Sequence, residues 1–124
     1  SWTTGNSGTS TNTLYGITFG NNQFFSVGNS GKLIISGDNG SNFSNVTSPV
    51  TKNIYSIAYG NNIFVGVGYR TVVVSNNNGS TVTEKENTLS FNDVTFGNGI
   101  FAAVGDNEVI YTSSDGDTWT KVYP

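Results

Sequence analysis

Three segments of this chain repeat one pattern at intervals of about forty residues, and this repeat constrains the fold more than any other feature. The segments are LYGITFGNNQFFSVG (14–28), IYSIAYGNNIFVGVG (54–68) and FNDVTFGNGIFAAVG (91–105). Their final glycines, Gly28, Gly68 and Gly105, are 40 and 37 residues apart. A period near 40 built from short apolar runs and glycine turns is typical of proteins that place one small sheet after another.

Each repeat predicts a four-stranded antiparallel sheet. The apolar runs are rich in β-branched and aromatic residues, and no window shows the 3.6-residue period of a helix. GNN or GNG between the first two runs supplies the positive φ that a tight hairpin requires. A third β-rich run and a polar, Thr-rich fourth run complete each unit. We therefore predict an all-β single domain over residues 1–124, with blade-like units at 14–47, 54–86 and 91–123.

The turns between the third and fourth runs carry a motif. They read SGDNGSNF (36–43), SNNNGSTV (75–82) and TSSDGDTW (112–119). These turns resemble the Asp-box, or BNR, repeat of β-propellers, in which Ser/Thr, Asp, Gly, Thr and an aromatic residue recur at fixed spacing. The second copy departs from the pattern at Asn77 and Val82, and the third fits only with one spacer residue omitted. The resemblance implies a sialidase-like or sortilin-like propeller scaffold in which these carboxylates shape the turn and do not catalyse.

The first residues, SWTTGNS, look like a further copy of the fourth run, because Trp2 aligns with Phe43, Val82 and Trp119. We therefore predict one extra N-terminal outer strand, over residues 1–8, before three complete blades. Propellers close with about four to eight blades, so three blades leave two apolar faces bare. Three alternatives remain open: a ring of identical chains, most simply a six-bladed dimer; a piece of a longer propeller; or an open head-to-tail filament.

Charge and composition exclude several classes of function. Charged residues are 10% of the chain, with 8 acidic and 5 basic side chains. Because the sequence contains no cluster of basic residues, we expect neither nucleic acid nor an anionic membrane as a partner. No apolar run is long enough for membrane insertion. The absence of Cys and His removes thiol nucleophiles and the usual zinc ligands, and the single arginine, Arg70, cannot build a sialidase-type arginine cluster. We expect no enzymatic activity, no catalytic residue, no metal and no cofactor, and we interpret Glu84 and Glu86 as solvated surface charges.

The loops between the second and third runs, together with the entrances to the first runs, are predicted to gather at one end of the propeller, opposite the motif turns. Aromatic rings and polar groups at such a shallow site suit glycans. The predicted ligand-binding residues are Tyr15, Asn29, Lys32, Tyr55, Tyr69, Arg70, Asn92, Asp106 and Glu108. The alternative interpretation makes them ordinary polar loop residues, with Tyr15 and Tyr55 in the core between blades.

The sequence thus predicts a non-catalytic, lectin-like or adhesin-like binding module that forms a homo-oligomer. Low charge and abundant Asn, Thr and Ser favour an extracellular or cell-surface location. The alternative function is a self-assembling structural subunit of a surface layer, fibre or appendage that uses strand exchange. The surplus N-terminal strand favours the structural subunit, whereas the non-repeating residues Tyr69, Arg70, Asp106 and Glu108 favour the binding module.

Overall fold

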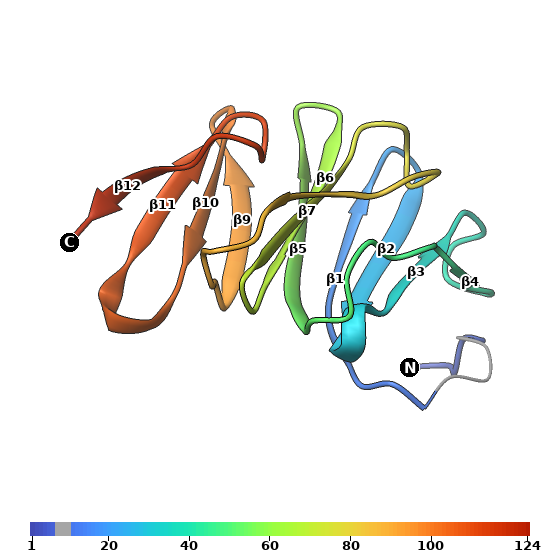
Figure 1. Ribbon diagram of the computed structural model, residues 1–124. Coiled ribbons are helices and arrows are strands. Elements are labelled where there is room, and N and C mark those ends of the chain that lie inside the picture. The colour runs from blue at the N-terminus through green and yellow to red at the C-terminus, as the bar shows by residue number, and fades with distance from the viewer. Residues whose placement is uncertain (7–10) are drawn as a thin grey trace.

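The repeat folds into three four-stranded antiparallel sheets, as predicted (Figure 1). The computed structural model describes residues 1–6 and 11–124. The first sheet contains β1 (Leu14–Gly20), β2 (Gln23–Gly28), β3 (Leu33–Ser36) and β4 (Ser44–Asn45). The middle sheet contains β5 (Ile54–Gly60), β6 (Ile63–Gly68), β7 (Thr71–Ser75) and β8 (Thr83–Glu86). The third contains β9 (Asp93–Gly97), β10 (Ile100–Val104), β11 (Ile110–Ser113) and β12 (Thr120–Tyr123).

The sheets stand side by side like the blades of an incomplete propeller. The first strands of the three sheets are neighbours, since β1 contacts β5 and β5 contacts β9. The polar fourth strands β4, β8 and β12 lie at the outer edges. Figure 1 shows the N-terminus beside the first sheet and the C-terminus beside the third, with the two outermost sheets far apart. The arrangement is therefore open, and one face of the first sheet and one face of the third have no neighbouring sheet.

Asparagine carries the tight turns between the first two strands of each sheet. Asn21 and Asn22 have φ of 50° and 64°, and Asn61 and Asn62 repeat these values at 50° and 65°. Left-handed backbone at both central positions twists a two-residue hairpin in the direction that its flanking strands require. Asparagine tolerates this conformation better than most residues with a side chain. The prediction made from the GNN segments is confirmed.

The three motif turns close around a buried serine. Ser36, Ser75 and Ser113 are buried, and their Oγ atoms accept hydrogen bonds from the backbone N–H of Gly40, Gly79 and Gly116 at 3.0, 2.9 and 2.8 Å. Each serine also donates to the next motif residue, Asp38, Asn77 or Asp115. The third turn reaches its glycine three residues after the serine instead of four, which accounts for the spacer that the sequence lacks. These contacts satisfy backbone groups that strands leave unpaired at a turn.

The carboxylates of the motif turns accept hydrogen bonds from backbone N–H groups of the same turns. Asp115 Oδ1 accepts the backbone N–H groups of Thr118 and Asp117 at 3.1 and 2.9 Å, which lowers the pKa of Asp115. Asp38 Oδ1 accepts the N–H of Asn42 at 3.0 Å, and this bond and the one from Ser36 lower the pKa of Asp38. Hydrogen bonds to the ionised form of a carboxyl group have this effect. Asn77 makes the corresponding bond to the N–H of Thr81 at 3.0 Å, so an amide can replace the carboxylate.

Two apolar cores fill the junctions between neighbouring sheets. Phe25, Val27 and Leu33 of the first sheet meet Ile57, Phe64 and Val73 of the middle sheet. Val65, Val67 and Val72 on the other face of the middle sheet meet Val94, Phe101 and Ala103 of the third. Because side chains alternate along a strand, the middle sheet, with a neighbour on each side, contributes one face to each core. Neighbouring sheets thus pack face to face.

The N-terminal segment differs from the predicted outer strand. Asn6 forms an isolated parallel bridge with Asn42, and residues 1–5 form no strand. Trp2 is fully exposed and does not occupy the place that Trp119 takes against Phe91. The first sheet already has its own fourth strand, β4, and the segment runs beside the motif turn, where the N–H of Asn6 donates to the Ser41 carbonyl at 3.0 Å. Residues 7 and 8 of the predicted strand lie outside the described residues. No helix in the described part of the chain is long and apolar enough to cross a membrane.

Candidate functional site

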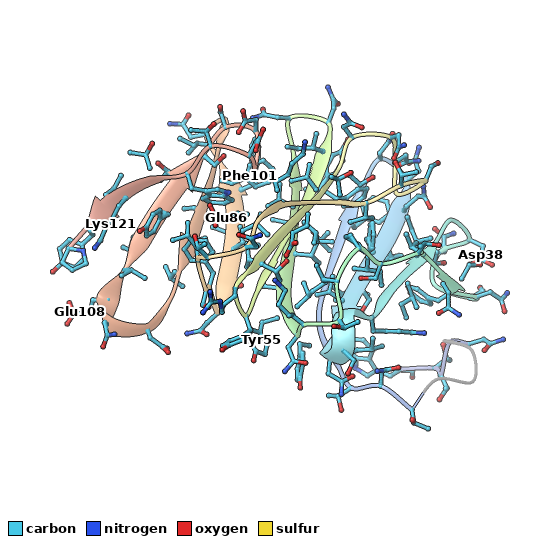
Figure 2. All side chains as sticks on the ribbon, in the orientation of Figure 1. Asp38, Tyr55, Glu86, Phe101, Glu108 and Lys121 are labelled. Atoms are coloured by element: carbon cyan, nitrogen blue, oxygen red, sulfur yellow. The ribbon has the colours of Figure 1, made fainter. Side chains whose placement is uncertain are left out.

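The turns between second and third strands lie at one end of the sheets, which we call the loop end. It comprises η1 (Asn29–Gly31), residues 69–70 and η2 (Asp106–Glu108), together with the starts of β1, β5 and β9. The strand registers place Leu14 beside Gly28 at this end, and Phe19 beside Phe24 toward the motif turns. Figure 2 shows Tyr55 and Glu108 at the same, lower side of the molecule. The loop end is therefore opposite the motif turns, as predicted.

Tyr15 and Tyr55 are the extra residues of two equivalent β-bulges. The pairing of β1 with β2 shifts between Leu14 and Gly16, and the pairing of β5 with β6 shifts between Ile54 and Ser56. A bulge leaves one residue unpaired and re-aims its side chain. The two rings meet with their centroids 5.3 Å apart and a tilt of 55°. Tyr15 is exposed and Tyr55 is half-buried, so the pair lies at the rim of the junction and not inside its core.

Asn53 connects this tyrosine pair to the neighbouring turn, and the sequence prediction did not include it. Its Nδ2 donates to the hydroxyl of Tyr55 at 3.4 Å, and its Oδ1 accepts the backbone N–H of Ser30 at 3.0 Å. Ser30, in η1, has a left-handed backbone with φ of 54°. The available sequence signal was position: Thr13, Asn53 and Ser90 each precede the first run of a repeat unit, and all three are polar.

The backbone of residues 69 and 70 is held firmly, and both side chains are exposed. The N–H of Tyr69 donates to the Asn53 carbonyl at 2.9 Å, and the N–H of Arg70 donates to Ser90 Oγ at 2.9 Å. The Arg70 carbonyl accepts a bond from Lys52 Nζ at 2.7 Å. Arg70 has a backbone φ of 50°, which residues other than glycine rarely adopt. A turn fixed in this way presents the phenol and the guanidinium to solvent with little backbone freedom.

Beside this turn, Glu84 is part of a polar network and is not the solvated charge that the sequence predicted. Glu84 Oε2 lies 2.9 Å from Lys52 Nζ and accepts the hydroxyl of Thr71 at 2.8 Å. Burial opposes ionisation of Glu84, but the hydrogen bonds from Lys52 and Thr71 and the Lys52 charge outweigh it and lower its pKa. Glu86 is also half-buried, and its carboxylate accepts the hydroxyl and the N–H of Thr88 at 2.6 and 2.7 Å. Glu84 and Glu86 differ from the predicted solvated charges because they lie on the less exposed side of β8, alternating with the exposed residues Thr83 and Lys85.

The other predicted site residues divide into two groups. Asn92 and Asp106 are brought together, since Asn92 Nδ2 donates to Asp106 Oδ1 at 3.1 Å, and Glu108 lies in the same exposed turn with φ of 62°. Asn29 and Lys32 serve the first sheet itself. Asn29 Oδ1 accepts the N–H of Thr13 at 3.0 Å, and Lys32 Nζ donates to Asn45 on β4. The structure thus pairs Tyr15 with Tyr55 at the junction of the first two sheets, whereas the turn of Tyr69 and Arg70 is bonded through its backbone to Asn53 on one side and to Ser90, before the third sheet, on the other.

Two polar grooves at the motif-turn end were not predicted. One lies between the first and middle sheets and includes Gln23, whose Nε2 donates to the Asn78 carbonyl at 2.9 Å. The other lies between the middle and third sheets and includes Asn61, which donates to the carbonyls of Gly99 and Ser114. In both grooves, a side-chain amide, that of Gln23 or Asn61, thus joins neighbouring sheets. Among the residues that the structure describes, no cluster of three or more Asp, Glu, His or Cys could hold a metal ion.

Comparison with solved structures supports the propeller architecture. The chain matches YCF48 bound to D1 peptide with a TM-score of 0.75 at 17% identity, over 90% of this chain and 40% of that one. It matches a chain of the nidogen/laminin complex with a TM-score of 0.70 at 13% identity, over 89% and 48%. It matches the computationally designed Ika4 protein with a TM-score of 0.69 at 13% identity, over 98% and 78%.

YCF48 and the nidogen/laminin neighbour are β-propellers, and at these identities the likeness concerns the fold alone. The chain spans less than half the length of these two neighbours. No family model matches the sequence, and no curated protein matches it.

Proposed function

We propose that the chain is a non-catalytic binding module that recognises glycans through the loop end of an assembled propeller. The observation that carries this proposal is the paired, partly exposed rings of Tyr15 and Tyr55, with the Asn53 amide bonded to the Tyr55 hydroxyl. Aromatic faces stack on the apolar faces of sugars, and amides and hydroxyls bond to sugar hydroxyl groups.

The neighbouring turn extends this surface. Tyr69 is 54% exposed, and the Arg70 side chain beside it is also exposed. The backbone N–H and carbonyl of Arg70 are both hydrogen-bonded, to Ser90 and Lys52. A preorganised turn lowers the entropy that is lost when a ligand binds. Asn92 and Asp106 supply further hydrogen-bonding groups at the same end of the third sheet. The proposal places the module outside the cell or on its surface, where glycans are exposed.

A glycan array probed with the unmodified full chain tests the proposal. We expect binding to a restricted set of sugars, and a dissociation constant that rises by about tenfold or more in Tyr15→Ala or Tyr69→Ala, since each removes an exposed ring. Trp2→Ala is the matched control, because Trp2 is a fully exposed aromatic residue in the N-terminal segment beside the motif turn. Absence of glycan binding, or equal loss in all three variants, would contradict the proposal.

Peptide binding is the alternative to glycan binding that solved structures of this fold indicate. The YCF48 structure contains a bound peptide, and the nidogen/laminin structure is a complex of proteins. A peptide array run in parallel distinguishes the ligand classes: peptide binding that needs Tyr15 and Tyr69, without glycan binding, would retain the binding module and overturn its ligand.

The second candidate function is a structural subunit that polymerises. It is favoured by the two open sheet faces at opposite ends of the chain, which allow each molecule to contact two others. Strand exchange through residues 1–8 has little support from the described part of that segment, where Asn6 makes an isolated bridge. Long polymers without glycan binding would favour this function over the first.

A further inference from the structure

Each junction between sheets contains a contact between an aromatic ring and a glycine. The ring of Tyr59 on β5 lies in the space that a side chain on Gly20 of β1 would occupy. The ring of Phe96 on β9 lies in the same way against Gly60 of β5. The aromatic residue is the next-to-last residue of a sheet's first strand. The glycine is the last residue of the first strand in the preceding sheet. Glycine is required because any β-carbon would overlap the ring.

Both halves of this contact recur, unpaired, at the two ends of the chain. Phe19 occupies the position of Tyr59 and Phe96, and it is 53% exposed. Gly97 occupies the position of Gly20 and Gly60, and a β-carbon there would have no atom within 4 Å. The first sheet thus presents a ring without a glycine, and the third presents a glycine without a ring. Each end supplies what the other end lacks.

A second contact repeats in the same way at the loop end. Ser30, a left-handed residue of the first turn, donates its N–H to Asn53 Oδ1, and its equivalent Arg70 donates to Ser90 Oγ. The third turn repeats the conformation at Asn107, with φ of 61°. The equivalent acceptor position before the first sheet is Thr13, which has a hydroxyl group and is exposed. The unpaired donor and acceptor again lie at opposite ends of the chain.

The faces that would meet are apolar and carry little charge. On the first sheet, Ile17, Phe19 and Phe24 point away from the junction core, and the Phe19 and Phe24 rings are 4.9 Å apart. On the third sheet, Ile100, Ala102 and Val104 point away from it, and Ile100 and Val104 are 40% and 42% exposed. Exposed apolar faces of this kind favour association. Asp93 at the edge of the third face is already bonded to Ser56 Oγ at 2.6 Å.

We propose that two copies of this chain form a closed six-sheet ring, in which the Phe19 ring of each copy lies against Gly97 of the other. The inference rests on the assembled propeller of the proposed function and is independent of its ligand. Both ends of a copy are used, and a twofold axis relates the two identical junctions. Six sheets fall within the usual range for closed propellers. β12 already fills the outer position of the third sheet, so the N-terminal segment can remain beside its own motif turn.

Sedimentation of the unmodified chain without any ligand tests the assembly separately from glycan binding. We expect a particle of twice 13.1 kDa that dissociates on dilution. Gly97→Val should fill the space for the ring without disturbing the single chain, and Phe19→Ser should remove the ring; each should weaken association by at least about tenfold. Thr83→Ala, on the exposed outer strand β8, is the control and should associate normally. A single-chain particle, or normal association of both interface variants, would overturn the proposal.

Cysteine cross-linking identifies the contact directly, because the chain has no cysteine of its own. Oxidising a mixture of Phe19→Cys chains and Gly97→Cys chains should give cross-linked mixed dimers. Oxidising either variant alone should give no cross-linked dimer. The double variant should stop at a two-chain product. A ladder of longer products would overturn the closed ring, and absence of mixed dimers would overturn the contact. Each result holds whether or not a glycan binds.

Discussion

The ring of Tyr59 lies against Gly20, in the space that any side chain at residue 20 would need. This contact joins two sheets through their innermost strands, and Phe96 repeats it against Gly60. Because the same pair recurs at each junction, the repeat preserves the way in which one sheet fits its neighbour. The effect of a β-carbon should therefore depend on whether that glycine has a neighbouring sheet.

Gly60→Ala should destabilise the chain by about 1–3 kcal/mol, since the new methyl group overlaps the Phe96 ring in a filled junction. Gly97→Ala should leave the stability of the single chain unchanged or raise it slightly, because the site is open and alanine restricts the unfolded chain. Urea unfolding at several protein concentrations, extrapolated to high dilution, separates this effect from association. Equal free energies of unfolding for the two variants would contradict the junction geometry.

Ser113→Ala should cost about 1–3 kcal/mol of stability. Its Oγ accepts the N–H of Gly116, and the loss would leave this buried donor without a partner. Ser114→Ala, at the next residue, removes an exposed side chain and keeps the backbone carbonyl that Asn61 uses, so it should change stability by less than about 0.5 kcal/mol. Thermal unfolding of both variants gives the comparison. A small effect at Ser113 would mean that the turn does not depend on its serine.

Stability should fall with acid below about pH 4, because the pKa values of Asp38 and Asp115 are lowered in the folded chain. A lowered folded pKa gives stability that is present above the unfolded pKa and is lost as pH falls through the folded pKa. Asp115→Asn should retain the turn, as Asn77 does, and should make stability less dependent on pH in this range. Unfolding midpoints between pH 2 and pH 7 measure the slope. An unchanged slope in this variant would contradict the assignment.

Lys52→Ala should raise the pKa of Glu84. Burial already opposes ionisation of this carboxyl group, and the variant removes both a hydrogen bond and a positive charge that offset it. Lys85→Ala removes an exposed cation next to Glu84 in the sequence, and it should leave the pKa of Glu84 nearly unchanged. Carbon-13 NMR titration of the carboxyl group reports both values. A larger rise in the Lys85 variant would show that general charge, and not the specific bond, controls Glu84.

The repeat made the sheets predictable because every unit carries its own local signals. Alternating apolar runs, asparagine turns and the serine-centred motif act within about forty residues, and all of them formed as expected at Asn21, Asn61 and Ser36. The same reasoning failed for Trp2. Its resemblance to Trp119 was local, but a fourth strand needs a free sheet edge, and β4 had already taken the edge of the first sheet.

At the candidate site, the sequence predicted which end of the sheets carries the exposed aromatic and polar residues. It did not predict how they would be arranged, because the contact of the Tyr15 and Tyr55 rings and the bond from Ser30 to Asn53 each join two sheets. Glu84 shows the same limit. Its charge suggested a solvated residue, and only the packing of Lys52 beside β8 made it part of a network.

The sequence by itself determined the number of sheets, their strand order and their turns, since these follow from side-chain periodicity and backbone preference within each unit. The tertiary structure alone decided which faces are covered, because burial depends on what the neighbouring sheet presents. Phe19 and Tyr59 occupy equivalent positions in the repeat, yet Tyr59 lies against Gly20 and Phe19 is 53% exposed. That difference comes from the open ends of the three-sheet arrangement.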